Sequence, residues 1–369
     1  RHYREGSLSL LPAQPVTIAI SLLLLAALAS TLVNWPIDNA FKGFIDEFRF
    51  ATLFLCLYCA GYSKQQYRLF ATLVVVGVLG GLAYGLVEFL SGMHNSFQFH
   101  SAGVVTQSSI YLGIAIMLNA GLLLDNENTS PRLSLFLKAA LLIQVIALLS
   151  MGSRGSMLAV ALCFLLLAIL ALRSKTIVAW VAGIGTAMVL VAGLIQLFPE
   201  NTFSKEVLRQ YSSERTQEAD SQRIAIWEIS FAKLATGEDL PLGIGPRNYK
   251  ALKDMEFLRN NDQLVQLDKY NHAHNLFLTQ LVEQGVLGLL AMLSVFLLFL
   301  LKIISAWRAE ARRSRSPRWA WYGGLGGLAV PVIAGMFNTP YYQEHAMLSM
   351  LVTGMLFAFY PDRNKPAQA

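Results

Sequence analysis

Residues 271–304 have the sequence NHAHNLFLTQLVEQGVLGLLAMLSVFLLFLLKII, in which a short polar start joins a long apolar stretch. An α-helix needs about 20 predominantly apolar residues to cross the hydrocarbon core of a bilayer, and this stretch is long enough. The sequence therefore predicts a membrane-spanning helix over residues 274–304, with histidine and asparagine side chains gathered at one end.

The composition of the whole chain extends this prediction. Of its 369 residues, 55% are hydrophobic and only 14% are charged, whereas an average soluble domain has about 25% charged residues. A soluble globular protein is excluded, and an all-α polytopic membrane protein is predicted. About ten transmembrane helices are expected, near residues 16–33, 45–62, 68–90, 108–124, 133–150, 155–172, 176–198, 274–304, 319–338 and 344–360. The three cysteines lie within these apolar runs and imply no disulfide framework.

The distribution of basic residues orients the predicted spans. Lysine and arginine gather at alternate helix ends and in the segment KIISAWRAEARRSRSPR (302–318), whereas short loops on the other side carry only Lys42, Arg49 and Arg154. Short cytoplasmic loops are enriched in lysine and arginine. Both termini are therefore expected in the cytoplasm, and residues 271–275 on the opposite, outer side.

One long polar segment, residues 199–273, lies on that outer side and carries many charges of nearly balanced sign. Within it, SQRIAIWEISFAKLA (221–235) predicts an amphipathic helix, capped by Asp220 or Ser221, with an apolar face of Ile224, Ile226, Trp227, Ile229 and Phe231. DLPLGIGPRNY (239–249) ends a helix through its glycines and prolines, and a second helix is expected over 249–266. The chain thus divides into N-terminal transmembrane helices (1–198), a folded helical loop domain (199–273) and C-terminal transmembrane helices (274–369).

Basic and imidazole side chains meet on the outer side. Arg154 lies in the turn SMGSRGSM (150–157), between glycines and serines that leave its guanidinium uncovered, which favours a functional role over snorkelling to lipid headgroups. Arg223 and Arg247 belong to the loop domain, and His272 and His274 follow it. Arginine binds phosphate through a planar fork, and histidine is the usual general base near neutral pH. These residues predict a site for a pyrophosphate-linked substrate.

The two histidines are not expected to be equivalent. On a helix their two-residue spacing would turn the side chains apart, so His274 is assigned as the base and His272 as a neighbour. A His-x-His metal site is disfavoured because no acidic partner follows at a fixed spacing, and no metal or other cofactor is expected. Asn275 is expected to cap the helix or orient the imidazole. Gly285 and Gly288 are expected to permit close helix packing.

Three motifs occur in an order found in a known family. His274 and Asn275 followed by Gly285 and Gly288, GSRGS at 152–156, and QRIAIWE with PLGIGPRNY within 222–249 together resemble the O-antigen ligases. Their superfamily also contains O-antigen polymerases and pilin-type O-oligosaccharyltransferases. The resemblance implies a metal-independent, GT-C-like glycosyltransferase of the bacterial inner membrane with a periplasmic active site. It also implies about twelve spans, so one or two N-terminal spans are expected beyond this sequence.

The resemblance assigns roles residue by residue. His274 corresponds to the catalytic histidine, and Arg154 and Arg223 correspond to arginines that hold the pyrophosphate. Arg247 lies in the glycine-rich turn, where many relatives have a small residue, and His100 and Gln107 occupy places comparable to donor-site residues before the fourth span. The expected substrate-binding set comprises Arg154, Arg223, Arg247, His272, Asn275, His100 and Gln107.

The implied reaction joins two lipid-linked partners. The donor would be a polysaccharide on undecaprenyl pyrophosphate and the acceptor a sugar hydroxyl of lipid A–core, both held among membrane lipids, and nucleic acid is not an expected partner. Attack on C1 in one step predicts inversion. A polymerase or a protein O-oligosaccharyltransferase of the same superfamily is the alternative enzyme. A flippase or transporter of lipid-linked glycans is disfavoured because intramembrane charges are few and gather on one side.

Overall fold

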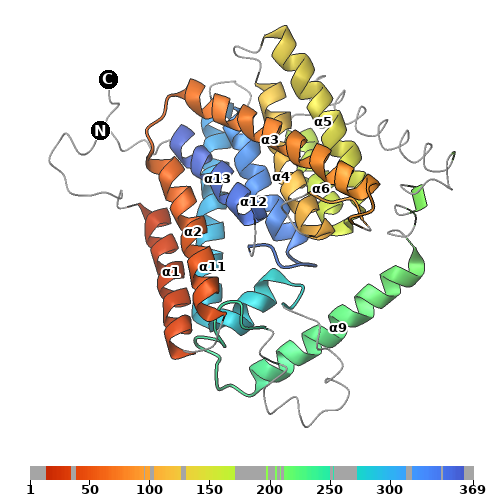
Figure 1. Cartoon of the computed structure of the whole chain (residues 1–369). Helices are drawn as coiled ribbons and strands as arrows, with labels where there is room; N and C mark the ends of the chain where they lie inside the picture. Colours follow the sequence, from red (N-terminus) through yellow and green to blue (C-terminus); the bar gives the residue numbers. More distant parts are fainter. Residues whose placement is uncertain are drawn as a thin grey trace.

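The computed structural model describes residues 14–34, 39–94, 96–99, 104–125, 130–170, 197, 204–205, 208, 212–249, 252, 272–312, 318–341 and 344–360. Within these residues every regular element is helical (Figure 1). The principal helices are α1 (Pro15–Val33), α2 (Ala40–Cys59), α3 (Lys64–Leu90), α4 (Val105–Leu124), α5 (Pro131–Met151), α6 (Arg154–Leu170), α9 (Ser213–Ala235), α11 (Leu276–Ala311), α12 (Trp319–Ala334) and α13 (Glu344–Phe359).

The length and composition of these helices identify a polytopic helical membrane protein. Five of the described helices, α1, α3, α4, α5 and α11, are long and apolar enough to cross a membrane. Shorter apolar helices are formed by α6, α12 and α13, whereas α2 carries charged side chains in its first half, including Asp46, Glu47 and Arg49. Each predicted span overlaps one of these helices except 176–198, which lies outside the described residues apart from residue 197.

Short polar signals set where several helices begin and end. The side chain of Ser63 accepts a hydrogen bond from the backbone N–H of Gln66 at the start of α3, and Ser130 caps α5 in the same way. Such caps satisfy N–H groups that have no partner within the helix. Gly152 ends α5 with a φ of 66°, a conformation that glycine adopts at no steric cost. Because α6 begins two residues later, Arg154 is held in a tight turn between two helices.

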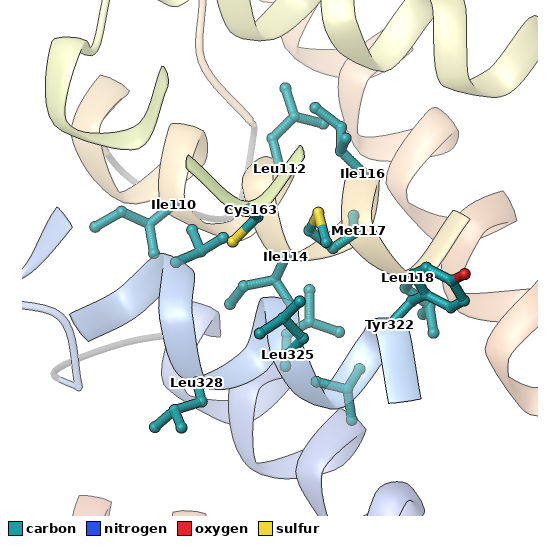
Figure 2. Packing of buried hydrophobic residues seen from close by; sticks show 14 of the residues in the cluster. Ile110, Leu112, Ile114, Ile116, Met117, Leu118, Cys163, Tyr322, Leu325 and Leu328 are labelled. Atoms are coloured by element: carbon teal, nitrogen blue, oxygen red, sulfur yellow. The ribbon is translucent and has the colours of Figure 1, made fainter. Parts of the chain in front are cut away.

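The core of the bundle lies where α4, α6 and α12 meet. Ile114 and Met117 of α4 are fully buried, and Figure 2 shows them beside Cys163 of α6 and Leu325 of α12. A Cβ on Gly326 of α12 would lie 2.4 Å from Cβ of Met117, so only glycine fits at this crossing. Small residues let transmembrane helices approach closely. In Figure 1, α12 and α13 stand between the group α1, α2 and α11 and the group α3 to α6.

Helix ends that the predicted topology places on one side do meet in the structure. The backbone oxygen of Asp125, just after α4, accepts a hydrogen bond from Arg68 of α3 at 3.1 Å. The Asp125 carboxylate lies 3.8 Å from the guanidinium of Arg318, which precedes α12. The backbone N–H of Arg318 donates to the hydroxyl of Tyr360, after α13, at 3.2 Å. The starts of α3 and α12 therefore lie together with the ends of α4 and α13, as alternation across a membrane requires.

The amphipathic helix α9 lies across the opposite end of the bundle (Figure 1). It begins at Ser213 rather than near residue 221, so the predicted cap is wrong, and Asp220 and Ser221 lie inside the helix. A capping side chain contributes only about 1 kcal/mol, so helical hydrogen bonding can continue past such a residue.

The apolar face of α9 is also narrower than predicted. Ile226 and Ile229 are buried in a small cluster with the start of α11, but Ile224 and Phe231 are 56% and 59% exposed. At 100° per residue, a face that buries Ile226 and Ile229 turns the other two side chains away. The second helix predicted over 249–266 lies outside the described residues apart from Tyr249 and Leu252.

Candidate functional site

The polar segment before α11 holds the two histidines in an irregular loop. Asn275 caps the helix, since its side-chain oxygen accepts hydrogen bonds from Phe277 N and Leu278 N at 3.0 Å, as the sequence predicted. His274 therefore precedes the helix, and its φ of 49° is unusual for a residue other than glycine. Strained backbone of this kind tends to occur at functional sites.

The rings of His272 and His274 contact each other, with centroids 4.2 Å apart. The expectation that they point apart is wrong, because it assumed a helix where the chain forms a turn. The backbone N–H of His274 donates to Nδ1 of His272 at 3.3 Å. An Nδ1 that accepts a hydrogen bond carries no proton, so a neutral His272 holds its proton on Nε2.

Two further hydrogen bonds fix this loop on the helices around it. Ala273 lies between the histidines, and its backbone N–H donates to the hydroxyl of Thr279 in α11 at 3.1 Å. The carbonyl of Ala273 accepts a hydrogen bond from the indole N–H of Trp227 in α9 at 2.9 Å. Arg223 lies four residues before Trp227, so both side chains project from the same face of α9. The indole therefore brings Arg223 to the His274 loop.

The electrostatics of the two imidazoles follow from this placement. Burial, and then the positive charge of Arg223, lowers the pKa of His274 to about 4. Burial, and then the neighbouring His274, lowers the pKa of His272 to about 3. Desolvation disfavours the charged form of an imidazole, and a nearby cation adds to this effect. Both histidines are therefore neutral at neutral pH, and the imidazole of His274 can accept a proton.

Arg154 reaches the same region through the segment that joins α12 to α13, residues 335–341, which we term the α12–α13 turn. A Cβ on Gly155 of α6 would lie 3.8 Å from Ala334 and from Phe337, so the start of α6 packs beside this turn. The start of α11 packs on it as well, because Asn275 donates to the backbone oxygen of Met336 at 3.1 Å. The Arg154 and His274 turns therefore contact one short segment.

Gln107 lies in the first turn of α4, next to the Arg154 turn. The hydroxyls of Ser109 in α4 and Ser156 in α6 form a hydrogen bond of 2.9 Å, which sets the two helix starts side by side. The Oε1 atom of Gln107 is buried, and it has no hydrogen-bond partner among the residues that the structure describes. His100, the other residue predicted in this stretch, lies outside the described residues.

The glycine turn, residues 239–249, inserts into a break in α11. Gly285 interrupts the helix with a φ of 66° and a ψ of −168°. A Cβ on Gly285 would lie 2.3 Å from the carbonyl carbon of Pro241, and one on Gly243 would lie 2.3 Å from that of Glu283. Four backbone hydrogen bonds of 2.8–3.2 Å join the turn to the broken helix. Close packing at Gly285 was predicted, but its partner is this turn rather than another helix.

The match to known families covers the elements that form this arrangement. The family described as O-antigen ligase matches residues 139–293. The matched region contains part of α5, all of α6 and α9, and the first half of α11. This finding confirms the resemblance that the ordered motifs predicted. No curated protein matches the chain significantly.

The region that matches the O-antigen ligase family contains the residues predicted for catalysis, but segments outside it complete their surroundings. Residues 139–293 include Arg154, Arg223 and His274. The α12–α13 turn and the first turn of α4 lie outside this range and pack against the α6 and α11 starts. The surroundings of the candidate site therefore come from α4, α6, α9, the start of α11 and the α12–α13 turn.

Arg247 of the matched region is placed differently from the other two arginines. Its guanidinium forms an ion pair with Asp46 of α2 at 2.9 Å, and its backbone N–H donates to the carboxylate of Glu283 at 2.9 Å. The same carboxylate accepts from the backbone N–H of Tyr249 at 3.2 Å. Arg247 thus helps to join the glycine turn to α2 and α11, and its predicted part in substrate binding stays a prediction.

Glu283 is a further candidate residue that none of the sequence motifs includes, although a signal was present. Glu283 is 3% exposed and lies in the first half of α11, within a predicted span. An ionisable residue at such a position usually has a structural partner or a functional role. Gln284 was also missed, and its side chain donates a hydrogen bond to Glu47 of α2. The contacts of Glu283 depend on the glycine turn that fills the break in α11, and the contact of Gln284 depends on α2, so no local pattern assigns either.

Proposed function

We propose that the protein is an O-antigen ligase, which transfers polysaccharide from undecaprenyl pyrophosphate to a sugar hydroxyl of lipid A–core. The observation that carries this proposal is the placement of a neutral imidazole, that of His274, within electrostatic reach of Arg223. The Arg154 turn lies against the same α12–α13 turn that supports the histidine loop. A proton acceptor beside guanidinium groups suits a reaction in which a hydroxyl attacks and a pyrophosphate leaves.

The proposed reaction is a single displacement. The acceptor hydroxyl oxygen forms a bond to C1 of the donor sugar while the bond from C1 to the pyrophosphate oxygen breaks. The hydroxyl proton passes to the imidazole of His274, and the bonding electron pair leaves with undecaprenyl pyrophosphate. Arg154 and Arg223 stabilise the negative charge that develops on the leaving oxygen, without a metal ion. Attack from the face opposite the leaving group inverts C1, and a positioned base contributes a rate factor of about 10²–10⁴.

The membrane arrangement of the proposed ligase follows the predicted topology. Ten spans in a GT-C-like arrangement, with both termini cytoplasmic, place the loop domain and the histidine loop in the periplasm of the bacterial inner membrane. Gln107 and His100 would meet the donor beside Arg154, and His272 and Asn275 would line the approach to the base. Arg247 would act with them at the margin of the donor.

Complementation of a ligase-deficient strain tests the proposal. The wild-type chain is expected to restore the ladder of polysaccharide-bearing lipopolysaccharide on a gel, whereas His274→Ala and Arg154→Ala are expected to abolish it. Arg132→Ala is a matched control, because Arg132 is exposed at the start of α5, the helix end opposite the Arg154 turn. Full ladder attachment by a purified His274→Ala protein would exclude the base assignment.

A purified assay separates the ligase from its superfamily alternatives. One lipid-linked glycan donor is offered in turn with lipid A–core, with a second lipid-linked glycan, and with a serine-containing peptide. The proposal expects product with lipid A–core alone. Product with the second glycan would identify a polymerase, and product with the peptide would identify a protein O-oligosaccharyltransferase.

A further inference from the structure

A partly open cavity lies between α1, α2, α11 and α13, and residues of the glycine turn and the α12–α13 turn also line it. The helices that enclose it pack on one another, α1 on α2 and α11, and α13 on α2 and α11. Neither histidine nor Arg154 or Arg223 lines this cavity. It is therefore distinct from the proposed catalytic groups, although Thr279 of its lining also holds the loop that carries His274.

The cavity has one polar end and one apolar end. Its apolar lining comes from the membrane-spanning parts of four helices and includes Leu23, Phe50, Val295, Phe296 and Met350. Its polar lining comes from the start of α2, the glycine turn and the first turns of α11 and includes Asp46, Glu47, Arg247, Gln280 and Glu283. An elongated site of this kind fits an amphiphile, with the chain among apolar side chains and the head at the polar end.

The polar end presents one hydrogen-bond acceptor and one donor that the protein does not use. Gln284 donates to Oε1 of Glu47, whereas Oε2 of Glu47 is buried and has no partner within the described part of the chain. The same holds for Nε2 of Gln280, a buried amide nitrogen that can donate. Buried polar atoms are generally hydrogen-bonded, so such a pair indicates a ligand group. A hydroxyl both donates and accepts, and therefore matches both atoms.

The charges at the polar end argue against an anionic head. Among the described residues that line the cavity, the one guanidinium, that of Arg247, is paired with Asp46 at 2.9 Å. Glu283 adds a further carboxylate to the same lining, and Glu47 adds a carboxyl group whose charged form is disfavoured by burial. A phosphate would meet more acidic than basic groups here, and like charges repel strongly away from water. The pyrophosphate of the proposed donor is therefore a poor occupant of this cavity.

We propose that this cavity binds an uncharged lipid, with its aliphatic chain between α1, α2, α11 and α13 and a hydroxyl of its head against Glu47 and Gln280. This site does not include His274, Arg154 or Arg223 of the proposed ligase, and Arg247, which lines it, would border the donor. Its occupancy does not require the transfer reaction.

Photocrosslinking of the full chain in nanodiscs tests the proposal. Two probes carry the same photoreactive acyl chain, one on diacylglycerol and one on phosphatidic acid, so they differ in the phosphate alone. Diacylglycerol is expected to label peptides that contain residues 46–51 and 292–296 at least several-fold more strongly than phosphatidic acid does. Equal labelling, stronger labelling by phosphatidic acid, or labelling confined to the exposed face around Leu297 would overturn the proposal.

Variants of Gln280 test whether the lipid head lies at the polar end of the cavity. Gln280→Met is expected to lower diacylglycerol labelling several-fold without raising phosphatidic acid labelling, whereas Gln280→Lys is expected to shift the preference toward phosphatidic acid. Leu297→Met, on the exposed face of α11, is the matched control and should leave both unchanged. If both Gln280 variants label as the wild type does, the placement of the lipid head against Gln280 is wrong. If neither variant folds, the comparison of the two probes in the wild-type protein still tests the proposal.

The experiment is independent of the proposed ligase reaction. It uses no donor and no acceptor, and His274→Ala is expected to label as the wild type does. Loss of transfer in His274→Ala with unchanged labelling would support both proposals. If the wild-type enzyme is active but diacylglycerol labels it no more strongly than phosphatidic acid does, only the lipid-site proposal is overturned.

Discussion

The imidazole of His274 is neutral at neutral pH because burial and then Arg223 lower its pKa to about 4. A lowered pKa means that the proton-accepting form persists to a lower pH than in an ordinary histidine, whose pKa is about 6.5. The acidic limb of kcat/KM, which reports the free enzyme, is therefore expected near pH 4. Arg223→Gln removes the cation and should move this limb to higher pH, whereas Arg223→Lys should leave it in place. Initial rates of the purified protein across pH measure both.

Donor binding provides an internal check on this prediction. A pyrophosphate beside His274 would favour the imidazolium, so the acidic limb of kcat, which reports the complex, should lie at higher pH than that of kcat/KM. If the acidic limb of kcat/KM lies at the same pH in the wild type and in Arg223→Gln, Arg223 is not the charge that acts on His274.

Asn275 has two separable contacts, and its variants should distinguish them. Its side-chain oxygen caps α11, and its amide nitrogen donates to Met336. Asn275→Ala loses both contacts, and we expect the free energy of unfolding to fall by about 1 kcal/mol. Asn275→Asp keeps the acceptor and should retain most of the thermal stability, measured as the midpoint of unfolding in detergent. If the two variants melt at the same temperature, the cap contributes little.

At the scale of elements, the docking of the glycine turn into α11 is sensitive to substitution at two glycines. Gly285→Ala and Gly243→Ala each place a Cβ 2.3 Å from a backbone atom, at φ values of 66° and 69°. Positive φ alone costs about 1–3 kcal/mol for other residues. We therefore expect each variant to lose transfer activity and to melt at a lower temperature.

A matched glycine provides the control for this docking prediction. In the described structure a Cβ on Gly80 of α3 would meet no heavy atom within 4 Å, so Gly80→Ala should keep activity and gain up to about 1 kcal/mol. Gly243 and Gly285 lie at the same contact between the glycine turn and α11. The double variant should therefore lose less stability than the sum of the losses in the two single variants. Additive losses would show that the two glycines act separately.

The same elements show what the sequence could and could not predict. Apolar runs and caps are local signals, so helices were predicted correctly at the described positions, as was the Asn275 cap. The contact of His272 with His274 was missed because it depends on an irregular turn rather than on helical spacing. The partners of Glu283 depend on which turn fills the break at Gly285, a long-range contact that no local pattern encodes.

At the scale of the whole molecule, the number of membrane crossings between two positions decides whether they lie on the same side of the membrane. Cysteine labelling can test this number. Single cysteines are placed at Met93, after α3, and at Glu238, after α9, in a chain whose own cysteines are replaced by serine; both positions are exposed. Between them lie α4, α5, α6 and the predicted span 176–198, which lies outside the described residues. Four crossings return the chain to the same side, whereas three leave it on the other.

A membrane-impermeant maleimide applied to intact spheroplasts is therefore expected to label both Met93→Cys and Glu238→Cys. Tyr62→Cys, in the exposed turn between α2 and α3, should react only after the membrane is permeabilised, because a single crossing by α3 separates it from Met93. Labelling of Met93→Cys without Glu238→Cys would show that residues 176–198 do not cross. The histidine loop, which α9 holds through Trp227, would then face the cytoplasm, and a periplasmic reaction would be excluded.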